Sequence, residues 1–150
     1  MENNIEWKIK PFKALSVDEL YEIMQLRSEV FVVEQNCVFL DMDGKDQKAL
    51  HLFGIYNEKI VAYVRLFDDN QYFKESSIGR VVVCTKHRDL KFGHLLMQKA
   101  IEEIKTQYNK TAIKIGAQLY LKKFYESHGF LKQGEVYDED GIDHIVMVRN

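Results

Sequence analysis

The segment with the clearest chemical potential is residues 78–97, where an apolar β-type run leads through a basic loop into a helix. The loop carries several cations, among them Arg88 and Lys91, and Gly93 follows them. The first amides of a helix lack internal partners and carry partial positive charge, so a helix that begins near Gly93 can bind an anion. Because a glycine lets a phosphate group approach the backbone closely, the segment predicts a site for a phosphorylated ligand. The alternative is an ordinary strand-to-helix turn with solvated cations.

The elements that must position this segment follow from the spacing of apolar residues. Three- and four-residue spacing predicts helices, and β-rich apolar runs between turn residues predict strands. The predicted order of elements is β-α-β-β-β-α-β-α-β-β, which indicates an α/β (α+β) fold. We expect a mixed sheet whose first strands are antiparallel and which is parallel around the strand before the basic loop. The chain holds one proline and no linker-like stretch, so we expect one domain over residues 1–150. The predicted helices cover 17–31, 92–108 and 119–128, and the predicted strands cover 7–12, 50–56, 60–67, 78–84, 112–117, 132–137 and 142–149.

Composition excludes several classes of protein. With 150 residues, 46% hydrophobic and 29% charged, the chain is typical of a globular domain rather than of a disordered chain or a coiled coil. A net charge of −2 argues against broad electrostatic binding to nucleic acid or to an anionic membrane. The apolar runs are too short to cross a bilayer, and the first residues do not resemble a secretory signal. We therefore expect a cytoplasmic protein with no nucleic-acid or membrane partner.

Cysteine and histidine spacing adds further exclusions. Cys37 and Cys84 are too few for a disulfide scaffold. The five histidines form no pair at helical metal-binding spacing, so we expect no metal site. The acidic segment 138–144, which ends in His144, either selects a cationic ligand or is only a hairpin tip.

Two motifs point to a known family. The segment 78–97 resembles the acyl-CoA-binding motif of the GNAT superfamily of N-acetyltransferases, with Arg88 at its first position and Gly93 at its last. The segment 121–130 resembles the second motif of that family, which contains Tyr125. The sequence differs from these family motifs at two positions: Lys91 replaces the usual middle glycine, and Gln118 replaces an asparagine. Residues 26–37 and 136–147 resemble the ElaA-like branch.

The resemblance implies a fold and a cosubstrate. The fold is a GNAT-like mixed, mostly antiparallel twisted sheet with splayed central strands, flanked by helices. The cosubstrate is acetyl-CoA, whose pantetheine arm would bind the backbone of a splayed strand and whose diphosphate would bind main-chain amides. The residues implied in binding are Val81, Val82, Val83, Arg88, Asp89, Leu90, Lys91, Phe92, Gly93, His94 and Gln118.

The implied reaction is direct transfer of an acetyl group to an amine. Tyr125 occupies the position of the acid that protonates the departing thiolate, and the amide of Val83 is the candidate for polarising the thioester carbonyl. A lysine-like amine is mostly protonated at pH 7, so a base is also needed. Glu34 and His51 are both candidates for this base, and each could instead be a surface group or a structural hydrogen-bonding group. The acceptor is expected to be an amine-bearing small molecule or peptide, and a homodimer is left open.

The alternative hypothesis is a non-catalytic module that binds acyl-CoA or a protein partner on the same fold. Three observations motivate it: Lys91 replaces a glycine, Gln118 replaces an asparagine, and the predicted strand 112–117 carries no carboxylate. Transfer of an acyl group to an amine distinguishes the enzyme from the module.

Overall fold

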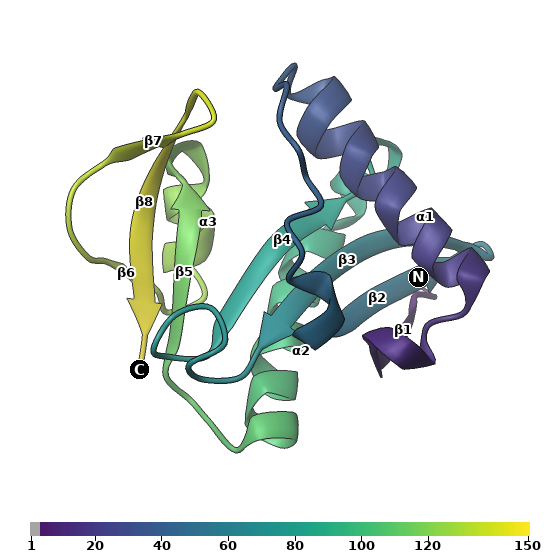
Figure 1. Cartoon of the computed structure of the whole chain (residues 1–150), viewed down its shortest axis with the longest axis horizontal. Coiled ribbons are helices and arrows are strands. Elements are labelled where there is room, and N and C mark those ends of the chain that lie inside the picture. Colours follow the sequence, from purple (N-terminus) through teal and green to yellow (C-terminus); the bar gives the residue numbers. More distant parts are fainter. Residues whose placement is uncertain (1–3) are drawn as a thin grey trace.

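The computed structural model describes residues 4–150, except for the side chains of Asp89 and Leu90. The chain forms two four-stranded sheets with helices packed on them (Figure 1). The first sheet has the order β1-β2-β3-β4, and in the second β8 pairs with β5, β6 and β7. The helices are α1 (Val17–Arg27), α2 (Phe92–Tyr108) and α3 (Lys122–Glu126). The strands are β1 (Glu6–Pro11), β2 (Leu50–Tyr56), β3 (Lys59–Phe67), β4 (Ser77–Val83), β5 (Ile113–Gln118), β6 (Leu131–Lys132), β7 (Tyr137–Glu139) and β8 (Ile142–Arg149).

The two sheets meet at β4 and β5 but do not pair along these strands. A parallel bridge joins Ser76 to Ile113, and the amide of Lys114 donates to the carbonyl of Ser76 at 2.9 Å. Beyond this contact the strands diverge (Figure 1). The expected splayed central strands are therefore confirmed, and the predicted parallel arrangement around β4 is reduced to a single bridge.

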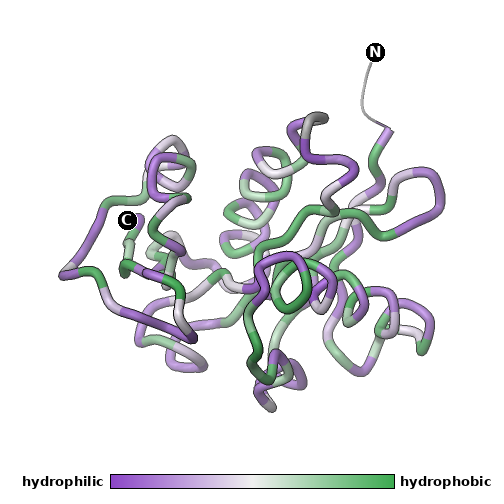
Figure 2. The backbone as a smooth tube through the Cα atoms, turned by 90° about the horizontal axis from the view of Figure 1, so that it is seen from above, coloured by the Kyte–Doolittle hydropathy of each residue, from purple (hydrophilic) through white to green (hydrophobic). Residues whose placement is uncertain are grey.

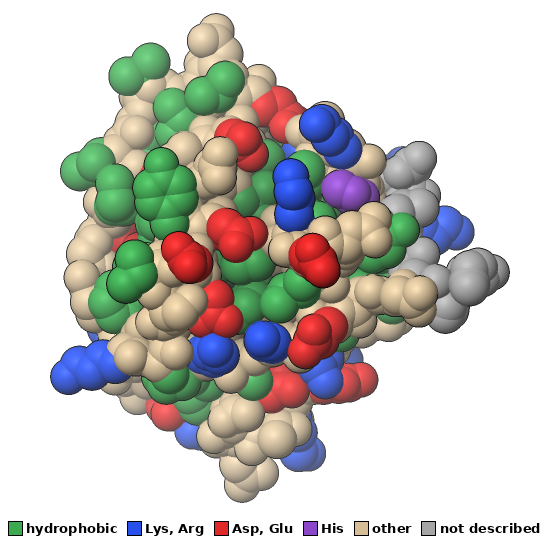
Figure 3. Space-filling view, turned by 90° about the vertical axis from the view of Figure 1, so that its right-hand side faces the viewer, with side chains coloured by type: hydrophobic (Ala, Val, Ile, Leu, Met, Phe, Trp, Pro, Cys, Tyr) green, Lys and Arg blue, Asp and Glu red, His purple; other side chains and the backbone are tan. Residues whose placement is uncertain are grey.

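The first sheet is covered on both faces, which explains why β3 is apolar along most of its length. Alternate residues of a strand point to opposite faces. Leu52 and Val64 pack with α2, whereas Phe53 and Tyr63 pack with α1. Hydrophobic residues accordingly follow the central strands, and polar residues gather in the outer loops (Figure 2). The face that carries α1 mixes acidic and basic side chains, in keeping with the small net charge (Figure 3).

A β-bulge bends β4 where the two sheets separate. The register changes between the pairs Tyr63–Val82 and Arg65–Gly79, so two residues of β4 face one residue of β3. Arg80 lies in the bulge with φ of +53°, a conformation that non-glycine residues seldom adopt. Pairing with β3 resumes beyond the bulge, at Val82 and Val83.

The first helix begins as predicted but ends differently. The Ser16 hydroxyl accepts from the amide of Glu19, and the Glu19 carboxylate accepts from the amide of Ser16, which completes the capping box. The α-helix ends at Arg27, and a π-helical segment follows over Ser28–Glu34. The expected continuous helix over 17–31 is therefore wrong in its last turn. The widened segment contains three valines, and π-helical turns often occur at functional sites.

The C-terminal part also departs from the expected elements. The predicted strand 132–137 is wrong, because β6 and β7 are two separate short strands that both pair with β8. The predicted helix 119–128 consists of a 3₁₀ turn, Leu119–Leu121, followed by the five-residue α3. The hairpin into β8 is confirmed, with its turn at Asp140 and Gly141. Within residues 4–150, no helix combines the length and hydrophobicity needed to cross a membrane.

Candidate active site

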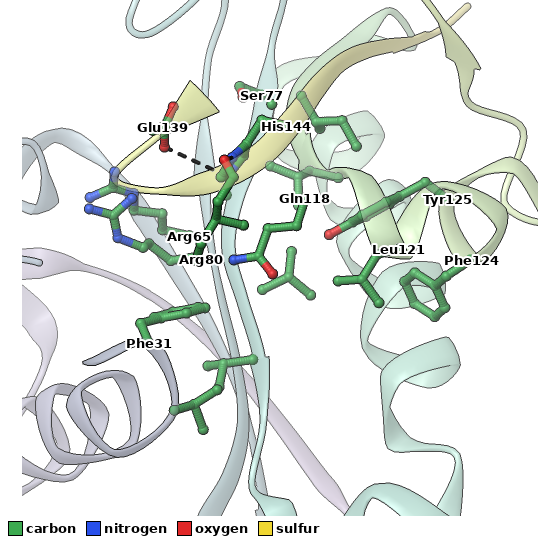
Figure 4. Close-up of a pocket in the computed structure, with 18 of the residues that line it drawn as sticks. Phe31, Arg65, Ser77, Arg80, Gln118, Leu121, Phe124, Tyr125, Glu139 and His144 are labelled. Carbon is green, nitrogen blue, oxygen red and sulfur yellow. Dashed lines mark hydrogen bonds and ion pairs between the residues drawn. The ribbon is translucent and has the colours of Figure 1, made fainter. Parts of the chain in front are cut away.

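A cavity of about 1070 Å³ opens between the diverging strands. Its walls come from both sheets and from the segments that flank them, and Figure 4 shows side chains from β4, β5, α3 and β8 directed into it. One end lies at the start of α2, lined by Arg88, Lys91 and Gly93. The other end lies against the β7-β8 hairpin, lined by Glu139 and His144. The cavity thus extends from a basic end at the start of α2 to an end that carries a carboxylate and a histidine.

The edge of β4 offers backbone groups to this cavity. Val81, Val82 and Val83 all line it, although the side chain of Val82 packs into the core beside α1. The amide of Cys84 donates to the carbonyl of Val61 at 2.7 Å. Because hydrogen-bonded residues alternate along an antiparallel pair, the amide and carbonyl of Val83 point away from β3 and toward the gap. The carbonyl of Val83 there accepts from Arg88 Nε at 3.2 Å.

The loop between β4 and α2 is a 3₁₀ turn over Thr85–Leu90, and its last residues belong to the segment that was predicted to bind the phosphates. The predicted Asp89 and Leu90 belong to this turn, and their side chains lie outside the described residues. The side chain of Phe92 is fully buried and stacks edge-on against Tyr56, so it can serve a ligand only through its backbone. His94 lines the cavity, with its Nδ1 2.9 Å from Nε2 of His128.

Lys91 is the N-cap residue that precedes α2, and it adopts the left-handed conformation with φ of 61° and ψ of 24°. This geometry explains why the family motif has a glycine at this position, since only glycine adopts it without strain. The side chain of Lys91 is exposed at the cavity wall and leaves the backbone path intact.

Replacing Lys91 separates the effect of its charge from that of its backbone strain. Lys91→Ala removes the charge and keeps the strain, whereas Lys91→Gly removes both. We expect Lys91→Gly to be more stable than Lys91→Ala by about 1 kcal/mol in urea-induced unfolding, because the left-handed conformation costs a residue with a Cβ about that much. Equal stability of the two variants would contradict the strained conformation.

Glu34 does not face a reacting group but holds Arg88. Its carboxylate accepts from Arg88 Nη1 at 2.6 Å and from the Thr85 hydroxyl at 2.6 Å. These hydrogen bonds lower the pKa of Glu34, which makes the carboxylate a weak base. The geometry favours a role in fixing Arg88 at the cavity over proton abstraction.

His51 lies away from the cavity wall and is fully buried. Its Nε2 donates to the carbonyl of Asp46 at 2.9 Å, since a carbonyl can only accept, and its Nδ1 therefore accepts from the Tyr63 hydroxyl at 2.7 Å. Burial lowers the pKa of His51. Both ring nitrogens are thus engaged in structural hydrogen bonds, and the structure does not bring His51 to the site as a base.

Tyr125 and Gln118 both line the cavity. The Tyr125 side chain extends from α3 with its hydroxyl directed toward Gln118 of β5 (Figure 4). Burial raises the pKa of the Tyr125 phenol, so the group remains protonated at neutral pH. The Gln118 amide exchanges hydrogen bonds of 3.2 and 3.3 Å with the amide of Gln35, which follows the π-helical segment. This pair links the N-terminal half of the chain to the second sheet across the cavity.

A buried network of charges shapes the cavity wall beside the bulge. Arg27, which is fully buried, donates to Asp41 and Asp46 at 2.8 Å each. Arg65 binds Asp46 at 2.9 Å, and Arg80 binds Asp41 at 2.8 Å. Each of these two carboxylates therefore joins Arg27 to an arginine that lines the cavity. Burial alone would raise the pKa of Asp46, but the hydrogen bonds and charges of Arg27 and Arg65 lower it.

The hairpin end of the cavity was not predicted from the sequence. His144 is buried and lines the cavity beside Glu139 and Asp140. The Cys37 thiol donates to the carbonyl of Asp140 at 3.1 Å and so fastens the loop after the π-helical segment to the hairpin. The only signal in the sequence was the acidic segment 138–144, which does not by itself show that the hairpin folds back onto the cavity.

The geometry at Gly93 tests whether the cavity fits an acyl-CoA donor. A Cβ added to Gly93 would lie 3.7 Å from the Phe124 ring and 4.0 Å from Val83, both ordinary contact distances. Packing therefore does not require a glycine, whereas a methyl group would fill part of the space at the cavity wall. With the exposed backbone edge of Val83 and the cations of the loop, this open space fits a ligand that combines an extended arm with phosphates.

Comparisons with known proteins agree with this arrangement. The sequence matches the acetyltransferase (GNAT) domain family over residues 12–150. It is 42% identical to the protein ElaA of Escherichia coli over 147 residues, which cover 97% of this chain and 96% of ElaA. The crystal structure of E. coli ElaA superposes with a TM-score of 0.90 and 41% identity over 97% of this chain and 99% of that one. An acyl-CoA N-acyltransferase from Pseudomonas aeruginosa superposes with a TM-score of 0.92 and 37% identity over 98% and 100%.

The diverging strands and the cavity beside the start of α2 therefore belong to a fold that this chain shares with an acyl-CoA N-acyltransferase. The chain belongs to the GNAT acetyltransferase family and is similar to ElaA along nearly its whole length. The family supports acyltransferase activity and an acyl-CoA cosubstrate.

Proposed function

We propose that this protein transfers the acetyl group of acetyl-CoA to an amine by direct attack. The observation that carries the proposal is the cavity between β4 and β5, which holds a backbone edge and the buried phenol of Tyr125 within one enclosure. A ternary complex in one cavity needs no covalent enzyme intermediate, because the amine can attack the thioester directly.

The residues that would hold the donor lie along one wall. The outward backbone groups of β4 would bind the pantetheine arm, and the start of α2 with Arg88 would bind the phosphates. The Val83 amide points into the gap, where it can donate to the thioester oxygen as negative charge develops there. The bound donor supplies the activated acetyl group.

Tyr125 is the proposed acid. Its hydroxyl faces the cavity, and burial keeps the phenol protonated. The phenol can therefore donate a hydrogen bond and then its proton to the departing CoA thiolate, whose negative charge is also disfavoured by burial in this enclosure. Gln118 and Glu34 have supporting roles, since Gln118 closes the cavity with Gln35 and Glu34 fixes Arg88.

The test is CoA release from acetyl-CoA with a panel of primary amines, followed by mass analysis of the products. We expect at least one amine to gain 42 mass units, the difference between a hydrogen and an acetyl group. Tight acetyl-CoA binding in calorimetry without transfer to any amine would favour the non-catalytic module instead.

Gly93→Ala should have opposite effects on stability and binding. Alanine is a better helix residue than glycine by about 1 kcal/mol, and the added methyl meets only ordinary contacts, so the free energy of unfolding should not fall. The methyl group occupies cavity space, and we expect the Kd for acetyl-CoA to rise at least about 10-fold in calorimetry. Unchanged affinity would contradict donor binding at this wall.

A further inference from the structure

The reaction needs a base, and the hairpin end of the cavity provides one. We infer that His144 is the general base that removes a proton from a cationic amine acceptor, with Glu139 stabilising the imidazolium that forms. This inference rests on the proposed function, and it identifies the acceptor as an amine that arrives protonated.

The tautomer of His144 is fixed by its own strand. Nδ1 lies 2.7 Å from the carbonyl of Ile142, and because a carbonyl can only accept, Nδ1 carries the hydrogen. In the neutral ring Nε2 therefore holds the lone pair. A base whose lone pair is oriented by a hydrogen bond at the other nitrogen is the arrangement that acid–base catalysis uses.

The surroundings of Nε2 suit a proton acceptor. The Glu139 carboxylate lies 3.8 Å from Nε2, and the Tyr137 ring packs on the imidazole with centroids 5.7 Å apart. A carboxylate at this distance stabilises the charged ring. His144 is only 7% exposed, and the face that it presents belongs to the cavity.

The base and the acid lie on opposite sides of Gln118 (Figure 4). His144 of β8 pairs directly with Gln118 of β5, and the Tyr125 hydroxyl approaches Gln118 from α3. An acetyl carbon placed between them would have the amine on the His144 side and the sulfur on the Tyr125 side. This is the order that displacement at a thioester requires, because the nucleophile and the leaving group need different proton-transfer partners.

The charges at this end select a cation. The cationic side chains that line this end of the cavity already have partners within the protein. Arg65 and Arg80 form ion pairs with aspartates, and Lys45 lies over the Tyr72 ring at 5.9 Å. Glu139 and Asp140 line the same end, and Glu139 is half exposed. An ammonium group is therefore favoured here both by the carboxylates and by the aromatic ring of Tyr137.

The proton balance is complete without another reactant. The ammonium gives one proton to Nε2 of His144, and the free amine attacks the carbonyl carbon as a C–N bond forms. The C–S bond breaks, and the thiolate takes the phenolic proton of Tyr125. After the attack, the nitrogen still carries one proton more than the amide product, and this proton passes to water. A proton from water then restores the phenol of Tyr125, and His144 releases its proton to solvent. The sum is an amide, free CoA and one proton.

The experiment compares two nucleophiles in wild type and His144→Gln. The first is a primary alkylamine that the wild type acetylates, and the second is the alkoxyamine of the same length, which is neutral at pH 7 and needs no deprotonation before attack. We expect His144→Gln to lower kcat/KM about 100-fold for the alkylamine but less than about 5-fold for the alkoxyamine. The KM for acetyl-CoA should not change.

Equal losses with both nucleophiles would show a structural role and overturn the inference, as would full activity of His144→Gln. Glu139→Gln provides a second test, because this exposed side chain can change without loss of the fold. It should lower kcat/KM about 10-fold for the alkylamine and leave the alkoxyamine unaffected, and no difference between the two would also count against the inference. If the wild type acetylates neither nucleophile nor any other amine, the proposed function itself fails, and the two failures are thereby distinguished.

Discussion

Replacing Tyr125 with phenylalanine should lower kcat for acetyl transfer about 100-fold while the Kd for acetyl-CoA stays within about 2-fold of wild type. Removal of a general acid typically costs between 10² and 10⁴ in rate. The ring remains, so the edge-on contacts of Tyr125 with Phe124 and Phe130 persist and the fold should not change. Steady-state CoA release and calorimetry measure the two quantities separately.

The matched control is Tyr120→Phe, which removes a hydroxyl at the same cavity. Tyr120 is 71% exposed and belongs to the 3₁₀ turn before α3, so it should not transfer a proton to a buried thiolate. Its kcat should stay within about 2-fold of wild type. If Tyr125→Phe behaved like Tyr120→Phe, the acid would have to be another group, although acetyl transfer itself would still stand.

The sequence was most informative where one short segment determines both structure and chemistry. The valine run, the cations and Gly93 lie within 20 residues, and the structure forms a strand, a loop and a helix from them as predicted. At Lys91 the residue type alone does not predict the backbone conformation, because this lysine adopts the left-handed conformation expected of the glycine that it replaces. The backbone geometry is therefore retained although the side chain differs.

Long-range contacts account for what the sequence analysis missed. His51 lies at the start of strand β2 and could be taken for a reactive group, yet Tyr63 and Asp46 from other segments form hydrogen bonds with both of its ring nitrogens. His144 lies in a segment that reads equally well as a hairpin tip, and only the fold of the hairpin onto β5 brings it into the cavity. Local patterns carry no information on such partners, since these pairs depend on how the two sheets diverge.

Arg27→Leu should be strongly destabilising, although Arg27 lies behind the cavity wall rather than in it. The guanidinium is fully buried between Asp41 and Asp46, and its loss leaves two buried carboxylates with fewer partners. Removing one member of such a network costs about 3–5 kcal/mol, and the lower end applies here because each aspartate keeps a second arginine. Urea-induced unfolding should therefore show a loss of about 3 kcal/mol.

Arg88→Leu is the matched control, since it removes the same group from an ion pair in which both side chains are about two-fifths exposed. An exposed pair contributes about 1 kcal/mol or less, so this variant should unfold near the wild-type midpoint.

Unfolding at low pH tests whether the loss of stability in Arg27→Leu comes from the loss of charge pairing. The folded pKa of Asp46 lies below its ordinary value, so its pairing stabilises the fold above about pH 4 and is lost as the pH falls. The difference in free energy of unfolding between wild type and Arg27→Leu should accordingly become smaller in acid. A difference that stays constant down to about pH 2 would mean that lost packing, rather than lost charge pairing, causes the destabilisation.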